Sequence, residues 1–423
     1  MLRSEEFLHT LKARIHALSF QVTHRRAITN FTRDRKLPFE VVFVMILKLV
    51  KRTLGIECEL LEDDPSRLPP SKQAFSKARY NIKHTGFQEL LELSLQQAYE
   101  DDPNYGTWKG YRLIAVDGSS LQLPLSDEIV EHFGRFKPNA TMGETTPMAR
   151  VSLFVDLCTS MICSARLGRW DVGERALASD QLTEVVGKMK DFQQDKLLFI
   201  YDRGYSSFDL MKQHAALGAD FLFRLPRSCY KKAWELVDAG ETDFDIDIQN
   251  KDKTEQLKVR VVAFPLKTGQ IEVLMTSLHD RCLFQLTDLA KAYNLRWHIE
   301  ECYKRLKVPA ELENFSGAGL EVVLQEFWAH LLMCNVLSIF MCNEQGPWNL
   351  DKIPQKRLNF SFLFGVMRSR LQQVIVGNCS AKAFQTFFQR AAARAYVKTR
   401  PGRSFSREKV GKPRRHHPYR RIC

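Results

Sequence analysis

The segment YNLRWHIEECYKRLK, which begins at Tyr293, sets acidic, basic and aromatic side chains at helical spacing. At roughly 100° per residue, Tyr293, Arg296, Glu300 and Lys307 fall within about 60° of one another on one face of a helix. Glu301 points about 100° away from Glu300, so only one of the adjacent glutamates shares that face. A carboxylate between cationic side chains could take part in metal and phosphate chemistry. A solvated Arg296–Glu300 ion pair is the simpler alternative.

Two aspartates are candidates for the same chemistry. Asp117 in AVDGS and Asp202 in IYDRG each follow an apolar run and precede a glycine within two residues. We expect both at the C-terminal ends of buried strands, where the glycine lets the chain turn and a carboxylate needs a partner for its charge. Mg²⁺ is such a partner. With Glu300 they make three carboxylates, which could hold two Mg²⁺ ions for phosphodiester chemistry.

The order of apolar and polar segments predicts the scaffold for these acids. From about residue 110 to 220 the order is strand, strand, strand, helix, strand, helix, which predicts an α/β fold with a mixed sheet and helices on its faces. Four strand-like runs between about residues 220 and 285 predict a β-rich segment ahead of the helix that carries Glu300. More helices follow to about residue 345.

The N-terminal part of the chain reads as helical and basic. The segment PPSKQAFSKARYNIKHTGFQELL predicts two helices around a turn at Gly86. Helix, short turn and helix is the outline of a DNA-reading motif, although any helical hairpin has the same outline. Lys72, Lys77 and Arg79 lie along the first helix and favour a DNA-binding role.

The net charge is concentrated at the C-terminus. Residues 398 to 423 hold ten lysines and arginines against one acid, Glu408, so this tail carries +9 of the formal net charge of +13. Such a tail predicts contact with a polyanion, and nucleic acid is the usual one. A disordered end that only aids solubility is the alternative.

Cysteine usage and apolar runs favour a cytosolic protein without a membrane span. The ten cysteines include no C-x-x-C pair, so we expect reduced, mostly buried thiols. The first residues are too charged for a signal peptide. The apolar runs at 41–47 and 327–342 are shorter than a transmembrane helix needs and predict buried helices.

Two other side chains have competing interpretations. Trp297 lies about 40° from Tyr293 on the helix and could stack on an unpaired base, but a core position is the stronger expectation. Asp156 lies within an apolar strand, and we expect it to pair with a neighbour rather than to bind a metal ion.

Three ordered segments resemble the signature regions of the DDE transposases of the insertion-sequence-four family. They are LIAVDGSSLQLP, LLFIYDRGYSSFDL and LAKAYNLRWHIEECYKRLK. The Y-x2-R-x3-E-x6-K signature of that family is met by Tyr293, Arg296, Glu300 and Lys307. The resemblance spans about residues 110 to 345.

The resemblance implies a fold and a set of ligands. It implies a ribonuclease-H-like catalytic core interrupted by the β-rich insertion, and it assigns Asp117, Asp202 and Glu300 as catalytic metal ligands. We therefore expect a helical DNA-binding domain over 1–105, a catalytic domain over 106–345 with its insertion at about 220–285, and a C-terminal region with the basic tail over 346–423. The expected cofactor is two Mg²⁺ ions, for which Mn²⁺ can substitute.

The resemblance also implies an activity. A bacterial insertion-sequence transposase would bind the terminal inverted repeats as a dimer, cut them with an activated water and join the freed 3′-hydroxyl to target DNA. Arg296 and Lys307 would grip phosphates near the scissile bond and Tyr293 would position the backbone or a terminal base. Arg203 and Tyr205 beside Asp202 are further candidates for DNA contact, with a purely structural turn as the alternative.

Two other functions remain open from the sequence. One is a host-adopted nuclease that cuts without integration, and the other is a non-catalytic regulator that occupies transposon ends. The presence of all three acids in context favours catalysis.

Overall fold

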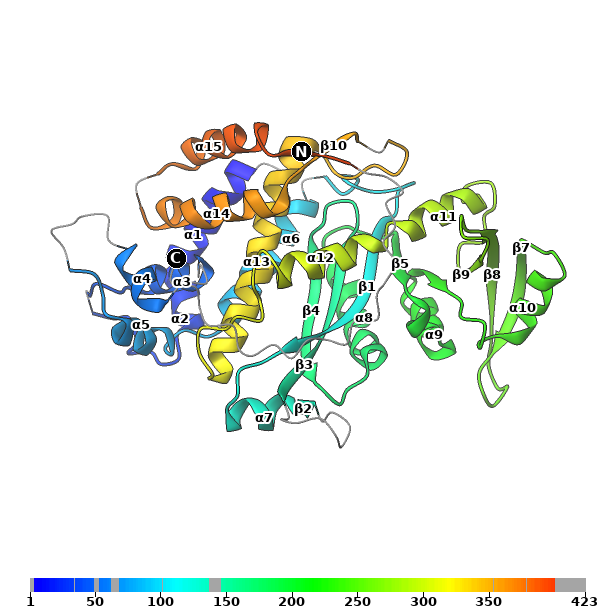
Figure 1. Cartoon of the computed structure of the whole chain (residues 1–423), viewed down its shortest axis with the longest axis horizontal. Coiled ribbons are helices and arrows are strands. Elements are labelled where there is room, and N and C mark those ends of the chain that lie inside the picture. Colours follow the sequence, from blue (N-terminus) through cyan, green and yellow to red (C-terminus); the bar gives the residue numbers. More distant parts are fainter. Residues whose placement is uncertain are drawn as a thin grey trace.

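A mixed β-sheet forms the centre of the molecule, with helices on both faces (Figure 1). The computed structural model describes residues 4–33, 35–48, 53–61, 68–100, 102–136, 146–352, 354–377 and 379–399. Within these residues the strand order is β2-β3-β1-β5-β6-β9-β8-β7, and β4 pairs with β3. The strands are β1 Arg112–Gln122, β2 Arg135–Phe136, β3 Thr146–Asp156, β4 Ile162–Arg169, β5 Leu197–Tyr201, β6 Asp220–Arg224, β7 Asp243–Gln249, β8 Gln256–Pro265 and β9 Ile271–Thr276.

Strand directions divide the sheet into three parts. Strand β3 runs antiparallel to both β1 and β4, whereas β1, β5 and β6 are parallel. Strands β9, β8 and β7 then continue the sheet in antiparallel fashion from β6. The predicted mixed sheet is confirmed, and the β-rich segment extends it at one edge, farthest from the N-terminal helices in Figure 1.

Two groups of helices cover the opposite faces of the sheet. Gly118 and Ser119 are neighbours in β1, so their side-chain positions face opposite ways. Helix α8 (Glu174–Asp191) lies against Gly118, and α12 (Trp297–Lys307) bonds to Ser119. The remaining helices near the sheet are α7 Asp127–Phe133, η1 Arg203–Tyr205, α9 Phe208–Leu217, α10 Lys231–Asp238 and α11 Leu286–Asn294.

The N-terminal and C-terminal helices form one helical body around α13 (Leu320–Gln345). Helix α13 packs against α6 and α3, α14 packs against α3 and α15, and α1 packs against α15. The helices are α1 Ser4–His16, α2 Leu18–His24, α3 Phe39–Lys48, α4 Leu54–Glu59, α5 Lys72–Arg79, α6 Thr85–Glu100, α14 Phe360–Ile375 and α15 Ala381–Ala393. A short ribbon of β10 (Lys356–Leu358) and β11 (Tyr396–Lys398) closes this side.

Helix α13 is apolar enough, by length and composition, to cross a membrane. However, 89% of its most apolar window is buried inside the protein. The predicted buried helix at 327–342 is confirmed as part of this core helix.

The expected turn at Gly86 is displaced in the structure. Helix α5 ends at Arg79 and α6 begins at Thr85, so Gly86 lies in the first turn of α6. A Cβ at this position would lie 2.9 Å from the ring of Phe43. The glycine therefore serves close packing of α6 on α3 rather than the turn between helices.

Candidate active site

Strand register brings Asp117 and Asp202 together. Parallel pairing of β1 with β5 runs from Arg112↔Leu197 to Val116↔Tyr201, so the two aspartates are the next residues in register. Asp202 follows the end of β5, as predicted. Asp117 does not end its strand, because β1 continues to Gln122 in pairing with β3. The two aspartates therefore lie side by side at the point where β5 ends and β1 continues.

The expected turn at Gly118 is wrong for the same reason. Strand β1 passes through this glycine in extended form. A Cβ on Gly118 would lie 2.5 Å from the carboxyl carbon of Glu174, at the start of α8. The glycine therefore provides room for a neighbouring side chain.

Arg296 connects the helix to the three predicted acids. Helix α11 ends at Asn294 and α12 begins at Trp297, with a tight turn between them, so the predicted helical segment is not continuous. The Arg296 guanidinium still lies 3.2 Å from Glu300. Burial acts to lower the pKa of Arg296, but Tyr293, Asp202, Asp117 and Glu300 raise it above its usual value.

Asp117 has an unfavourable electrostatic environment. Burial, with further contributions from Glu174 and Asp202, raises its pKa to about 7, although Arg296 and the N–H of Gly118 act in the opposite direction. That N–H donates to the carboxylate at 2.9 Å. An additional cation beside a carboxyl group with a raised pKa stabilises its ionised form.

Tyrosines and a lysine fix the geometry around the aspartates. The Tyr293 hydroxyl donates to the Asp202 carboxylate at 3.4 Å. Tyr303 of α12 donates to the main-chain carbonyl of Asp117 at 2.8 Å. Lys307 donates to Ser119 and to the Ser120 carbonyl, and so fastens the end of α12 to β1.

Asp117, Asp202 and Glu300 all interact electrostatically with the Arg296 guanidinium. They do not form a complete set of metal ligands. In the described part of the chain, no three His, Cys, Asp or Glu side chains are grouped closely enough to hold a metal ion. The donor chemistry nevertheless suits a hard divalent cation, because Asp117 and Asp202 are adjacent carboxylates and one of them is strongly perturbed.

The predicted DNA-contacting residues outside the centre fall into two groups. Lys72 and Lys77 on α5 and Arg203 at the start of η1 are exposed. Arg79 is only 3% exposed and pairs with buried Glu326 at 3.0 Å. Its assignment as a DNA contact is corrected, because burial and this ion pair make it a link between α5 and α13.

The structure shows which of the competing interpretations holds for Trp297 and for Asp156. Trp297 is 47% exposed, so the expected core position is wrong. Its ring lies 5.3 Å from the Arg296 guanidinium. Asp156 is fully buried and pairs with Arg112 at 2.6 Å, which confirms that it pairs with a neighbour.

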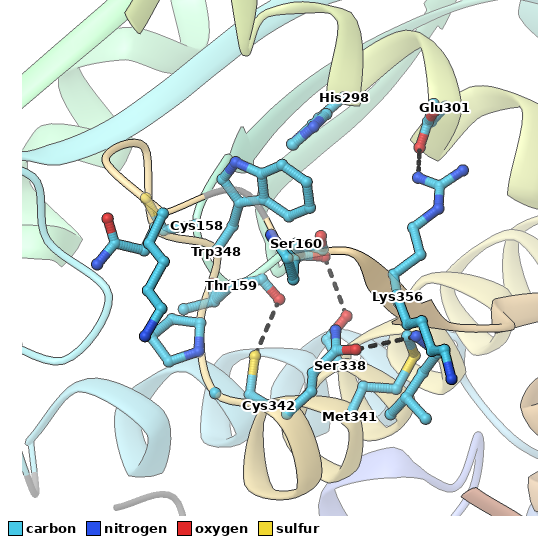
Figure 2. Close-up of a pocket in the computed structure, with 18 of the residues that line it drawn as sticks. Cys158, Thr159, Ser160, His298, Glu301, Ser338, Met341, Cys342, Trp348 and Lys356 are labelled. Carbon is cyan, nitrogen blue, oxygen red and sulfur yellow. Dashed lines mark hydrogen bonds and ion pairs between the residues drawn. The ribbon is translucent and has the colours of Figure 1, made fainter. Parts of the chain in front are cut away.

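Glu301 lies on a different side of α12 from Glu300, and its ion pairs hold parts of the fold together. Glu301 and His298 line a cavity of about 680 Å³ beside α13. Figure 2 shows both side chains at this cavity. Glu301 pairs with Arg357 at 3.0 Å and with Arg305 at 3.6 Å. Burial acts to raise the pKa of Glu301, but these arginines and His298 hold it below its usual value. The residue joins α12 to the C-terminal ribbon.

Sequence reasoning missed two residues near the aspartates, Glu174 and Arg150. It named Tyr205 as a candidate DNA contact or part of a structural turn, and the structure buries this side chain at 3% exposure. Burial is the largest cause that raises the pKa of Tyr205, and Asp117, Glu174 and Asp202 add to it. Arg150 pairs with Glu174 at 3.1 Å. Nothing in the spacing of Glu174 marks it, because it reaches the centre only through the packing of α8 on β1.

A known protein family matches the part of the chain that holds the predicted acids. The family described as Transposase DDE domain matches residues 108–336, which include all three predicted acids. The chain belongs to this family, and it is an enzyme that cleaves DNA and transfers its strands.

One curated relative specifies the type of transposase. The chain is 23% identical over 319 residues to the transposase InsG for insertion sequence element IS4 of Escherichia coli strain K12, covering 72% of this chain and 70% of the relative. The chain is a transposase of the insertion-sequence-four type.

Two solved structures of other transposases show a weaker likeness to the chain. The piggyBac transposase in a synaptic complex with hairpin DNA gives a TM-score of 0.45 at 9% identity, covering 92% of this chain and 77% of that one. A pre-cleavage Mos1 transpososome gives a TM-score of 0.18 at 12% identity, covering 45% and 61%.

Proposed function

We propose that Asp117, Asp202 and Glu300 are the catalytic carboxylates of cut-and-paste transposition. The observation that carries this proposal is the register of β1 and β5, which sets the two aspartates side by side under the helix of Glu300. The strand order β4-β3-β1-β5-β6, with β3 antiparallel to its neighbours, supports a ribonuclease-H-like core.

The same carboxylates would hold two Mg²⁺ ions, for which Mn²⁺ can substitute, because oxygen ligands suit both ions. When bound, the metal would activate the attacking oxygen and stabilise the leaving oxygen. Arg296 and Lys307 would bind phosphates near the scissile bond once DNA offers them an alternative to Glu300 and β1. Tyr293 would hold Asp202 in position through its hydroxyl.

The partner would be double-stranded DNA, both the terminal inverted repeats and the target. Exposed Lys72, Lys77 and Arg203 would contact phosphates. We further propose a DNA-binding role for residues 1–105, catalysis by 106–345 and phosphate contact by the basic residues of 398–423, most of which lie outside the described residues. Because two transposon ends must be brought together, the protein would form at least a dimer on DNA. It would act at the nucleoid in the bacterial cytoplasm.

The test is cleavage of DNA that carries the transposon ends by the full chain in Mg²⁺. Asp117→Asn should abolish cleavage while DNA binding remains. Glu184→Gln, at an exposed side chain on α8, serves as a control that should cleave normally. Cleavage by Asp117→Asn at the parent rate would refute the metal assignment. Transfer of the cut end into a target plasmid distinguishes the transposase from a host-adopted nuclease, and the absence of any cleavage would favour a non-catalytic regulator.

A further inference from the structure

The cavity beside Glu301 is separate from the candidate active site. Its walls come from α12, from the turn between β3 and β4, from the C-terminal end of α13, and from the segment and ribbon that follow α13 (Figure 2). Asp117, Asp202 and Glu300 are not among its lining residues. Its volume of about 680 Å³ lies within the range of roughly 300 to 1,000 Å³ that is usual for small-molecule sites.

The lining of this cavity is cationic. Four of its side chains are basic and one is acidic, namely Arg305, Lys352, Lys356 and Arg357 against Glu301. Burial is the main cause that lowers the pKa of His298, so this imidazole adds no charge near neutral pH. A concave surface with an excess of one charge attracts ligands of the opposite charge, and this cavity therefore suits an anion.

Two guanidinium groups converge at one point of the wall. Arg357 and Arg305 lie 3.0 Å and 3.6 Å from the same oxygen of Glu301, Oε2. The exposed Lys356 directly precedes Arg357 on β10. Guanidinium groups match the geometry of phosphate oxygens, and lysine adds a compact positive charge. A phosphate group fits this arrangement better than a carboxylate, since it has more oxygens to share among three cations.

Trp348 provides a second and independent sign of a binding position. Its main-chain N–H donates to the Cys158 carbonyl at 2.7 Å, and its ring meets the His298 ring edge-on at 5.0 Å. The indole is therefore held in place in the cavity wall (Figure 2). Its Nε1–H is buried and has no hydrogen-bond partner among the described residues. Such a donor is costly to leave unsatisfied, and a ligand with an acceptor atom would satisfy it.

The aromatic side chains indicate the rest of the ligand. Tyr396 of β11 lines the same cavity as Trp348 and is 43% exposed. Aromatic side chains beside cationic ones are the usual surroundings of a nucleic-acid base and its phosphate. The chain's own C-terminal tail is a poor occupant, because residues 398 to 423 hold ten lysines and arginines against one acid.

We infer that this cavity binds a nucleotide, with the phosphate at Arg357 and Lys356 and the base beside Trp348. Two sources offer the same chemistry, a free mononucleotide and the unpaired end of a DNA strand. The inference does not depend on the catalytic roles proposed for Asp117, Asp202 and Glu300.

The experiment is a calorimetric titration of the full chain with deoxyadenosine monophosphate, and with inorganic phosphate and deoxyadenosine as the two halves of that ligand. The mononucleotide should bind more tightly than either half. Lys356→Gln should weaken its binding about 3- to 10-fold with an unchanged thermal midpoint, because the side chain is exposed. Trp348→Phe keeps an aromatic ring without the N–H and should also weaken binding. Lys382→Gln is the matched control, since Lys382 is an exposed lysine on α15 that does not line the cavity.

A second titration distinguishes the two sources. It uses a single-stranded deoxyadenosine pentanucleotide with a 5′-phosphate, and the readout is the difference between Lys356→Gln and Lys382→Gln, because other basic surfaces also attract DNA. A loss confined to Lys356→Gln supports the inference, and assigns the site to a free nucleotide or to a strand end according to the ligand that shows it. Equal affinities of the two variants for both ligands, or phosphate alone binding as tightly as the mononucleotide, would overturn it. DNA cleavage is not measured here, so the proposed function stands or falls separately.

Discussion

Replacement of Arg296 by glutamine should increase the affinity of the DNA-free protein for Mn²⁺ while it reduces DNA cleavage. Arg296 is 4% exposed and lies among Asp117, Asp202 and Glu300. Its guanidinium therefore supplies the positive charge that a metal ion would supply. Removal of a phosphate-binding side chain should nevertheless slow cleavage.

The magnitude follows from the Arg296–Glu300 pair. An ion pair at about 4 Å is worth roughly 4 kcal/mol at an effective dielectric constant near 20. The Glu300 side chain is 22% exposed, so we reduce the cost of separating the pair to about 1 to 3 kcal/mol. At about 1.4 kcal/mol per factor of ten, the gain in Mn²⁺ affinity should be roughly 5- to 100-fold.

The assay is calorimetric titration with Mn²⁺ at about pH 8.5, where Asp117 is mostly ionised even with its raised pKa. Arg305→Gln is the matched control, because Arg305 lies on α12, which Arg296 directly precedes, and pairs with Glu301 instead. It should leave Mn²⁺ affinity unchanged. A lower affinity in Arg296→Gln than in the parent would refute the idea that this guanidinium competes with the metal.

Three further predictions concern stability and the roles of neighbouring residues. The pKa of Asp117 is raised from 3.8 to about 7. Between these pH values the folded protein keeps a proton that the unfolded chain has released, so the stability of the fold falls as pH rises through that window. Metal-free Asp117→Asn should therefore be more stable than the parent in urea by about 1 to 3 kcal/mol near pH 8 and about equal near pH 4; no gain at pH 8 would contradict this. Glu300→Gln should abolish cleavage but not DNA binding, whereas Glu301→Gln should lower the thermal midpoint and keep most cleavage, and the reverse pattern would mean that the two glutamates were assigned wrongly. Arg79→Ala should cost about 3 to 5 kcal/mol in urea unfolding, while Lys77→Ala should leave stability unchanged and reduce the salt dependence of DNA binding by about one unit of slope; similar effects on stability would disprove the distinction.

Local patterns in the sequence predict the surroundings of two of the candidate carboxylates. Asp202 follows an apolar run that forms β5, and Glu300 shares a helical face with Arg296, which pairs with it in the structure. Periodicity also separates Glu300 from Glu301. These features depend on residues close together in the chain, so spacing is enough to predict them.

Long-range packing explains what the sequence could not predict. Gly86 and Gly118 both suggest turns, but each provides room for a side chain from another element. Arg79 has the spacing of an exposed base, yet Glu326, far away in the chain, draws it into the core. Glu174 likewise reaches Gly118 only because α8 packs on β1. No local pattern contains the identity of such a partner.

We propose above all that Asp202 binds the catalytic metal ion together with Asp117 and Glu300. The most direct measurement is cleavage of transposon-end DNA by Asp202→Cys in Mg²⁺ and in Mn²⁺, because a thiolate is a poor ligand for Mg²⁺ and a better one for softer ions. We expect no cleavage in Mg²⁺ and partial recovery in Mn²⁺. Cleavage at the parent rate in Mg²⁺ would mean that Asp202 is not a metal ligand.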